Sequence, residues 1–258
     1  EDESILLDLS ASDVDEDVLT FSILGGTNIF ASLTDSQVSF TSVLDFNGSE
    51  SFTVSVTDAE YTDSQIITVT ATPVNDAPVL DVISDQNMNE GGTKILVLSA
   101  SDIDEDALTY TITEGTNILP SIDGSTITFS VIDDDWNGSE SFTASVTDGE
   151  YTEDQIFIVT VDNVNDAPVL ATVSDVSFNE DGSSTLDLSA SDVDEDVLTF
   201  SILGGTNIFA ILTDSQVSFT SVLDFNGSES FTVSVTDDEY TDSQIITVTV
   251  SPVNDAPV

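Results

Sequence analysis

The stretch that decides the fold reads Asn47-Gly-Ser-Glu-Ser-Phe-Thr-Val-Ser-Val-Thr-Asp58. Phe52, Val54 and Val56 alternate with polar residues, which is typical of a half-buried β-strand. Asn47-Gly48 ahead of an alternating run is a strong signal for a tight turn between strands. The same stretch recurs almost unchanged at 137–148 and 226–237. It therefore predicts a strand, a turn before that strand, and a structural unit that is repeated three times.

Other motifs repeat with the same spacing. Asp-Val-Asp-Glu-Asp at 13–17 recurs in nearly the same form at 102–106 and 192–196, and Asn-Asp-Ala-Pro-Val occurs at 75–79, 165–169 and 254–258. Every offset is 89 or 90 residues, which suits an independent domain and is too long for a solenoid unit. We therefore predict three domains, called repeats 1, 2 and 3, at residues 1–79, 80–169 and 170–258.

Repeats 1 and 3 are close copies, whereas repeat 2 diverges. Residues 1–79 and 180–258 align without a gap and differ at seven positions. Repeats 2 and 3 also carry a leader segment, Leu80–Asn89 and Leu170–Asn179, ahead of the Glu that matches Glu1. If the leader is the first strand, repeat 1 lacks that strand and exposes a sheet edge. We expect a preceding domain or another subunit to supply it.

Further short alternating runs complete each repeat. In repeat 1 they cover Leu7–Ala11, Leu19–Ile23, Val38–Phe40 and Ile67–Ala71, and turn residues separate them. No stretch has the periodicity of a helix. Six or seven short strands in each repeat predict an all-β chain, made of three tandem antiparallel β-sandwich domains of immunoglobulin-like type in an elongated array.

The composition excludes several classes of function. The 258 residues include 50 Asp plus Glu, one Lys or Arg, and neither His nor Cys, for a formal net charge of −49. Binding to the nucleic-acid backbone needs clustered cations, and the usual general base, thiolate nucleophile and zinc ligands are missing. Because 39% of the residues are hydrophobic, we expect folded domains rather than acidic disorder. We predict neither catalysis, nor nucleic-acid binding, nor membrane insertion.

The acidic residues recur in the same loops of each repeat. An Asp-x-Asp pattern places two carboxylates close together, and at an effective dielectric constant of about 20 two charges ~4 Å apart interact by about 4 kcal/mol. Because Lys and Arg are almost absent, a metal ion is the natural counter-charge. Calcium takes six to eight oxygen ligands, whereas magnesium dehydrates reluctantly. The alternative is an acidic surface adapted to salty surroundings.

The order of these motifs resembles the cadherin-type repeat, in its tandem form from large bacterial surface adhesins. Glu90 is similar to the early Glu of that repeat, and Leu98–Asp104 to the strand and loop that hold its Asp-x-Asp. Asp135–Glu140 falls at the acidic turn of the family, although Asn137-Gly138-Ser139 lengthens the turn here. Asp148 matches the later Asp, and 164–168 resembles the linker motif.

The resemblance implies calcium (Ca2+) ions shared where one repeat follows the next. Around the first linker the implied ligands are Glu1, Asp45, Glu50, Asn75, Asp76, Asp102, Asp104 and Asp148. Around the second they are Glu90, Asp135, Glu140, Asn165, Asp166, Asp192, Asp194 and Asp237. The matching acids of repeat 1 are Asp13, Asp15 and Asp58. Pro78 supports a short, extended linker because proline disfavours helix before it.

Together these features predict a calcium-rigidified structural extension, or stalk, of a large secreted or cell-surface bacterial adhesin. The alternative is a subunit of an extracellular filament, with the missing strand donated between neighbours. The expected partners are neighbouring repeats of the same chain or identical subunits, through filament or homophilic contacts. A repeat that itself binds carbohydrate is a third hypothesis.

Overall fold

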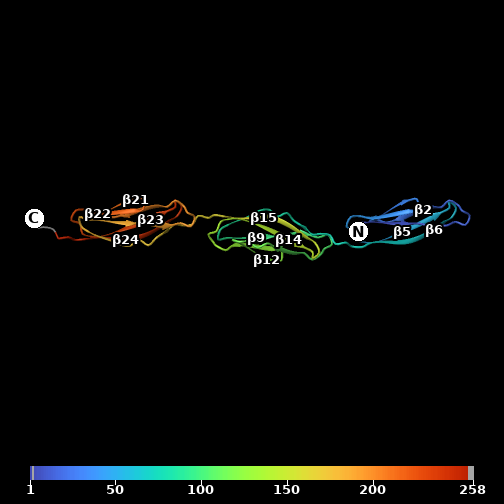
Figure 1. The fold of residues 1–258 in the computed structure, drawn as a ribbon, viewed down its shortest axis with the longest axis horizontal. Coiled ribbons are helices and arrows are strands. Elements are labelled where there is room, and N and C mark those ends of the chain that lie inside the picture. Colours follow the sequence, from blue (N-terminus) through green and yellow to red (C-terminus); the bar gives the residue numbers. More distant parts are fainter. Residues whose placement is uncertain (2, 255–258) are drawn as a thin grey trace. The chain divides into compact units, whose positions relative to one another are not determined.

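The computed structural model describes residues 1 and 3–254, and all its regular elements within these residues are β-strands (Figure 1). None of the described residues forms a helix that is long and apolar enough to cross a membrane. The chain forms two compact units. One contains Glu1–Gln86, Lys94–Phe129 and Glu140–Val159, and the other contains Asn87–Thr93, Ser130–Ser139 and Thr160–Val258.

Repeat 1 folds into two three-stranded antiparallel sheets, with the strand orders β1-β4-β3 and β2-β5-β6. The side chains of Ile29, Val38, Phe40 and Phe52 are buried in its core. The rings of Phe40 and Phe52 meet edge to face, with centroids 5.1 Å apart, a favourable geometry for aromatic pairs. Its strands are β1 (Ser4–Asp8), β2 (Thr20–Gly25), β3 (Ile29–Thr34), β4 (Gln37–Ser42), β5 (Gly48–Thr57) and β6 (Thr62–Ala71).

Repeat 2 adds short strands to the same plan. Its sheets have the strand orders β10-β7, β11-β14-β15-β8 and β12-β13-β9. The strands are β7 (Val79–Leu80), β8 (Gln86–Asn89), β9 (Thr93–Val97), β10 (Ala100–Ser101), β11 (Thr109–Ile112), β12 (Ile118–Asp123), β13 (Thr126–Val131), β14 (Gly138–Thr147) and β15 (Thr152–Asp162).

Repeat 3 has the corresponding sheets β16-β19, β17-β24-β23-β20 and β18-β22-β21. Its core includes Phe219 and Phe231, which again meet edge to face. The strands are β16 (Val169–Leu170), β17 (Val176–Asn179), β18 (Ser183–Asp187), β19 (Ala190–Ser191), β20 (Thr199–Gly204), β21 (Ile208–Thr213), β22 (Gln216–Ser221), β23 (Gly227–Thr236) and β24 (Thr241–Ser251).

The leader segments form the extra strands. Leu170 begins the leader of repeat 3 and pairs with β19, and β17 at its end adds to the edge of the larger sheet. The β17–β24 pair is parallel, which departs from the predicted antiparallel pairing. The leader pairs first with β19 in the two-stranded sheet and then with β24 in the four-stranded sheet, where it runs in the same direction as β24. The predicted all-β sandwich fold is otherwise confirmed, whereas the domain limits at 79/80 and 169/170 stay a prediction.

The turn predicted at Asn47-Gly48 is wrong in its position. Gly48 is already the first residue of β5, and the turn lies earlier, where the amide of Phe46 donates to the carbonyl of Val43 at 3.2 Å. Asp45 in this turn has a φ of 57°. The segment connects β4 in one sheet to β5 in the other, so it is a crossover rather than a hairpin.

Candidate metal centres

Three carboxylates from distant parts of the sequence meet around the first linker. Oxygen atoms of Glu1, Asp76 and Asp104, called here the linker-1 cluster, lie within 4.8 Å of one another. Glu1 precedes β1, Asp76 follows β6, and Asp104 lies in the loop after β10. Two hydrogen bonds hold the carboxylates in place: the amide of Val74 donates to Glu1 at 2.8 Å, and the amide of Asp76 donates to Asp104 at 2.8 Å.

The second linker repeats this geometry. Oxygen atoms of Glu90, Asp166 and Asp194, the linker-2 cluster, also lie within 4.8 Å of one another. The amide of Val164 donates to Glu90 at 2.6 Å, and the amide of Asp166 donates to Asp194 at 2.6 Å. Two different sets of sequence segments therefore build the same arrangement of carboxylates.

The Asp-x-Asp loops form two further clusters that share a residue with the first two. Asp102, Asp104 and Asp106 make one, and the loop 192–196 makes the other with Asp192, Asp194 and Asp196. In the first, Asp102 Oδ1 accepts the amides of Asp104 at 3.0 Å and Asp106 at 3.2 Å. This Asx-type turn fixes the loop and leaves the other oxygen of Asp102 for another ligand.

Several of these carboxylate oxygens are buried without a donor. Among the described residues, Glu1 Oε2, Glu90 Oε2, Asp102 Oδ2 and Asp192 Oδ2 are shielded from solvent and accept no hydrogen bond. A buried carboxylate oxygen without a partner costs free energy. Because all four belong to the carboxylate clusters, a cation bound there would supply the missing partner. Hard oxygen donors in such a set fit calcium.

The linker asparagines attach to the tip of the following repeat. The side-chain amide of Asn75 donates to Asp148 at 2.9 Å, and that of Asn165 donates to Asp237 at 3.0 Å. Burial raises the pKa of the Asp148 carboxyl, but the hydrogen bonds from Asn75 and from the amides of Tyr151 and Glu150 outweigh it and lower the pKa. Asp148 therefore stays ionised beside the linker.

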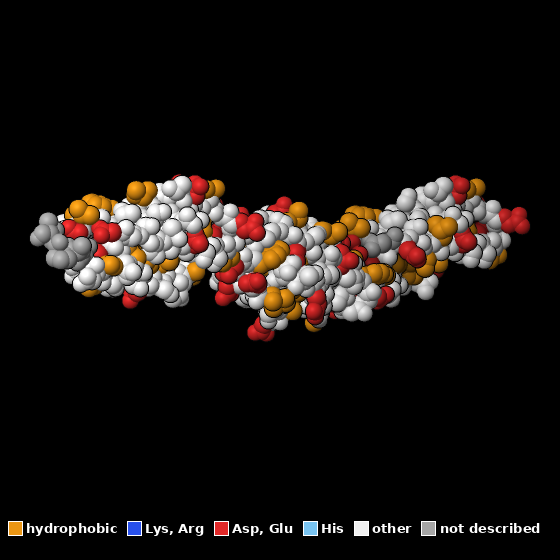
Figure 2. Space-filling model, turned by 60° about the vertical axis from the view of Figure 1, so that its left-hand side comes forward, with side chains coloured by type: hydrophobic (Ala, Val, Ile, Leu, Met, Phe, Trp, Pro, Cys, Tyr) orange, Lys and Arg blue, Asp and Glu red, His pale blue; other side chains and the backbone are white. Residues whose placement is uncertain are grey.

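Burial and neighbouring negative charges raise the pKa of two other carboxylates. Burial and the charges of Asp166, the neighbouring acids and Asp194 raise the pKa of Asp135. Burial and the charges of Asp192, Asp194 and Asp237 raise the pKa of Asp196. Both groups thus sense the negative field around the second linker, which a bound cation would reduce. Figure 2 shows how Asp and Glu side chains spread over one face of the molecule.

The predicted ligands Glu50 and Glu140 accept hydrogen bonds from backbone amides, and their role as ligands stays a prediction. Both oxygens of Glu50 accept hydrogen bonds, from the amides of Thr27 at 2.7 Å, Asn28 at 3.0 Å and Ile29 at 3.0 Å. Glu140 accepts the matching amides of 116–118. These carboxylates fix the loop before β3 or β12, and we leave them out of the proposed metal sites.

Other predicted ligands lie outside the four clusters found among the described residues. Asp13, Asp15, Asp58 and Asp45 are in repeat 1, where the amide of Asp15 donates to Asp13 at 2.8 Å. The sequence reasoning also missed two cluster members, Asp106 and Asp196. Their signal was the third Asp of Asp-x-Asp-Glu-Asp, whose carboxylate lies close to those of the first two.

Comparison with known proteins shows the family of this chain. The family described as "Bacterial Ig domain" matches residues 1–70, 75–161 and 165–249. The chain belongs to this family. Its three matched segments account for the repeated β-sandwich, and Ig-like and cadherin-like domains are typically non-catalytic. Membership of this family is consistent with an extracellular or surface protein.

Among solved structures, mouse clustered PcdhgC3 EC1-3 covers 91% of this chain and 89% of its own, with a TM-score of 0.54 and 15% identity. At that identity the likeness shows the cadherin-like fold alone. An endo-fucoidan hydrolase of glycoside hydrolase family 107 matches with a TM-score of 0.31 and 21% identity, over 92% of this chain but 39% of its own. Chitinase A of Pseudoalteromonas piscicida is 30% identical over 130 residues, 49% of this chain. The match spans 16% of that chitinase.

Proposed function

We propose that this chain is a calcium-rigidified structural extension region of a large secreted or cell-surface bacterial adhesin. The bacterial Ig family supports a structural, extracellular role. The observation that carries the calcium part is the pair of linker clusters, in which each set of carboxylates contains a buried oxygen without a hydrogen-bond donor.

The residues that would hold calcium come from three places in the sequence at each linker. At the first linker they are Glu1, the linker residue Asp76, and Asp102 and Asp104 of the following loop. Bound calcium would supply positive charge and oxygen coordination at this point. Because the ligands belong to consecutive repeats and to the linker, binding would oppose bending of the linker, and its loss would leave repelling carboxylates.

Small-angle X-ray scattering of residues 1–258 in calcium and in EDTA tests the proposal. We expect the maximum dimension to be larger and better defined in calcium, because chelation frees both linkers. The Asp104→Asn/Asp194→Asn double variant should scatter like the EDTA form in either buffer.

The Asp35→Asn/Asp214→Asn double variant is the matched control. It removes the same charge from two exposed turns with φ values of 57° and 54°, a conformation that Asn tolerates well. This control should respond to calcium like the unmodified chain. Identical scattering of the unmodified chain in calcium and EDTA, together with no calcium binding by calorimetry, would remove the basis of the proposal.

A second candidate is a spacer within a larger secreted polysaccharide-degrading enzyme. The partial similarity to a chitinase favours it. The sequence that flanks residues 1–258 in the native polypeptide discriminates between the two: a catalytic domain there supports the spacer, whereas further repeats with a surface anchor support the adhesin. Retention of residues 1–258 on chitin beads would instead support the hypothesis that a repeat binds carbohydrate.

A further inference from the structure

Repeat 3 has a strand edge with which no other described strand pairs. In its smaller sheet, β21 pairs with β22 along one side only (Figure 1). No Asp, Glu, Lys or Arg occurs from residue 197 to residue 213, although the chain has 50 acidic residues. An uncharged strand edge with open backbone groups is a place where another strand can add to the sheet.

The free backbone groups of β21 follow from its pairing with β22. The amide of Val222 donates to the carbonyl of Asn207 at 2.8 Å. Backbone groups alternate in direction along an antiparallel strand, so those that point away from β22 belong to residues 208, 210 and 212. The amide of Ile208 agrees with this, because it donates to Glu229 of β23 in the other sheet at 3.0 Å. The edge therefore presents the amides and carbonyls of residues 210 and 212.

Repeat 2 closes the same edge with a proline. Pro120 of β12 stands at the position of Ala210 in β21 and of Ala31 in β3. Proline has no N–H group, and within sheets it is found on edge strands where that group would face solvent. Pro120 thus removes the outward amide at the middle of the edge, whereas repeats 1 and 3 keep it.

The edge of β21 is complementary to itself. In an antiparallel pair of β21 strands with Ala210 opposite Ala210, the two alanines exchange backbone hydrogen bonds. The amide of each Leu212 then meets the carbonyl of Ile208 in the other copy. The same register places Phe209 opposite Ile211, twice by two-fold symmetry. Phe209 and Ile211 are 51% and 65% exposed, and an aromatic residue opposite a β-branched one stabilises paired strands.

The charge of the chain does not oppose this pairing locally. The first acid after β21 is Asp214, in the turn before β22. In the two-fold register, Asp214 of one copy lies opposite residue 206 of the other, so the two Asp214 residues are at opposite ends of the paired strands. Their separation is about 26 Å at ~3.3 Å per residue, which exceeds the screening length of about 10 Å at 0.1 M salt.

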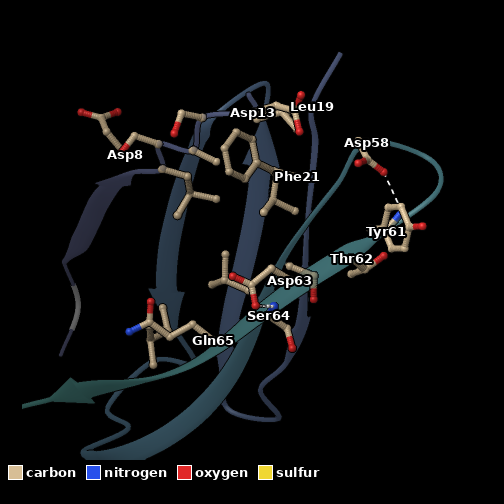
Figure 3. Close-up of a pocket in the computed structure, with 18 of the residues that line it drawn as sticks. Asp8, Asp13, Leu19, Phe21, Asp58, Tyr61, Thr62, Asp63, Ser64 and Gln65 are labelled. Carbon is tan, nitrogen blue, oxygen red and sulfur yellow. Dashed lines mark hydrogen bonds between the residues drawn. The ribbon is translucent and has the colours of Figure 1, made fainter. Parts of the chain in front are cut away.

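The matching strand of repeat 1 is less suited to the same pairing. β3 differs from β21 only in Ser32, which replaces Ile211. A two-fold pair of β3 strands would therefore place Phe30 opposite a serine. Repeat 1 also has a hollow lined by residues of β1, β2, β5 and β6 (Figure 3). No residue of β3 lines that hollow, so the comparison of β3 with β21 is independent of it.

We propose that two copies of this chain associate through their β21 strands, which pair antiparallel with Ala210 at the centre. The partner is a second copy because the register that matches the free backbone groups also matches the apolar side chains. Ser32 makes β3 the weaker edge, and Pro120 excludes β12. The association needs no cation, because no charged side chain lies between the paired strands.

Sedimentation equilibrium of residues 1–258 tests the proposal. We expect a reversible monomer–dimer equilibrium without larger species. Ala210→Pro should abolish the dimer, and Pro120 shows that a folded repeat accepts proline at this position. Ala31→Pro makes the same change in β3 and should leave the dimer intact. Ile211→Ser, which gives repeat 3 the strand of repeat 1, should weaken the dimer by about tenfold because both apolar pairs are lost.

Hydrogen exchange read by mass spectrometry locates the contact. The peptide 208–213 should exchange more slowly as the protein concentration rises, whereas 29–34 should not, and Ile211 or Ser32 distinguishes the two by mass. Thermal melting by circular dichroism checks that both proline variants fold. A chain that stays monomeric at millimolar concentration, or an Ala210→Pro variant that folds and still dimerises, would overturn the proposal. So would larger species that both proline variants abolish, because β21 would then pair with β3 of the next copy.

Discussion

At the scale of single residues, Glu229 shows how one carboxylate can fix a loop. Its oxygens accept the amides of Thr206 at 2.7 Å, Asn207 at 3.0 Å and Ile208 at 3.0 Å. Burial raises the pKa of Glu229, but these hydrogen bonds outweigh burial and lower the pKa to about 2. The ionised form is therefore the one that stabilises the folded loop.

We predict that Glu229→Gln destabilises repeat 3 by about 1 kcal/mol at pH 7, since a neutral amide replaces a charged acceptor that is partly screened by solvent. The folded pKa lies below the unfolded one. The stabilisation is therefore complete above the unfolded pKa and disappears as the pH falls toward 2. Urea unfolding followed by circular dichroism should show the difference at pH 7 and its decline below pH 4. Glu239→Gln, in an exposed turn, is the control, and an equal effect there would contradict the assignment.

The sequence could predict the clustered aspartates but not the role of this glutamate. Asp102 and Asp104 are two residues apart in one loop, so their proximity follows from local geometry. Glu229 meets amides more than 20 residues earlier in the chain, and only the pairing of β20 with β23 brings them together. An acid in a turn is therefore ambiguous until its non-local neighbours are known.

At the scale of strands, the alternating apolar residues predicted β4, β5 and β6 well, because the side-chain period of 2 is local information. The crossover before β5 was mistaken for a hairpin because Asn-Gly favours positive φ values in either setting. In repeat 2 the matching Gly138 has a φ of 147°, and an added Cβ would lie 2.8 Å from the Trp136 ring. Glycine here permits ring packing as well as a backbone conformation.

We predict that Gly138→Ala destabilises repeat 2 by about 2 kcal/mol, through backbone strain and displacement of the Trp136 ring. Because Trp136 is the only tryptophan, its emission should shift toward longer wavelength in the folded variant. Gly149→Ala is the control: φ is 105° there, but no heavy atom lies within 4 Å of the added Cβ. Ala59 already adopts a φ of 80° at the matching position. A smaller loss and unchanged emission are expected for the control, and the reverse order would refute the packing argument.

At the scale of the whole molecule, part of the net charge of −49 lies in carboxylates that stand close together. The linker clusters hold carboxylates within 4.8 Å, well inside the screening length of about 10 Å at 0.1 M salt. Dissolved salt screens such partly buried groups much less than exposed ones. The metal-free chain should therefore retain a repulsion between these carboxylates that monovalent salt reduces only in part. A cation bound at the clusters should remove more of this repulsion.

We predict that raising NaCl from 10 to 300 mM increases the melting temperature more in EDTA than in calcium, because bound calcium has already neutralised the clusters. Calorimetry of residues 1–258 under the four conditions measures the effect. The Asp104→Asn/Asp194→Asn variant should lose most of the calcium-induced rise in melting temperature, whereas Asp35→Asn/Asp214→Asn should keep it. If the salt dependence were the same with and without calcium, and both variants behaved alike, the charge would be a uniformly solvated surface, and the linker clusters would have no special part in stability.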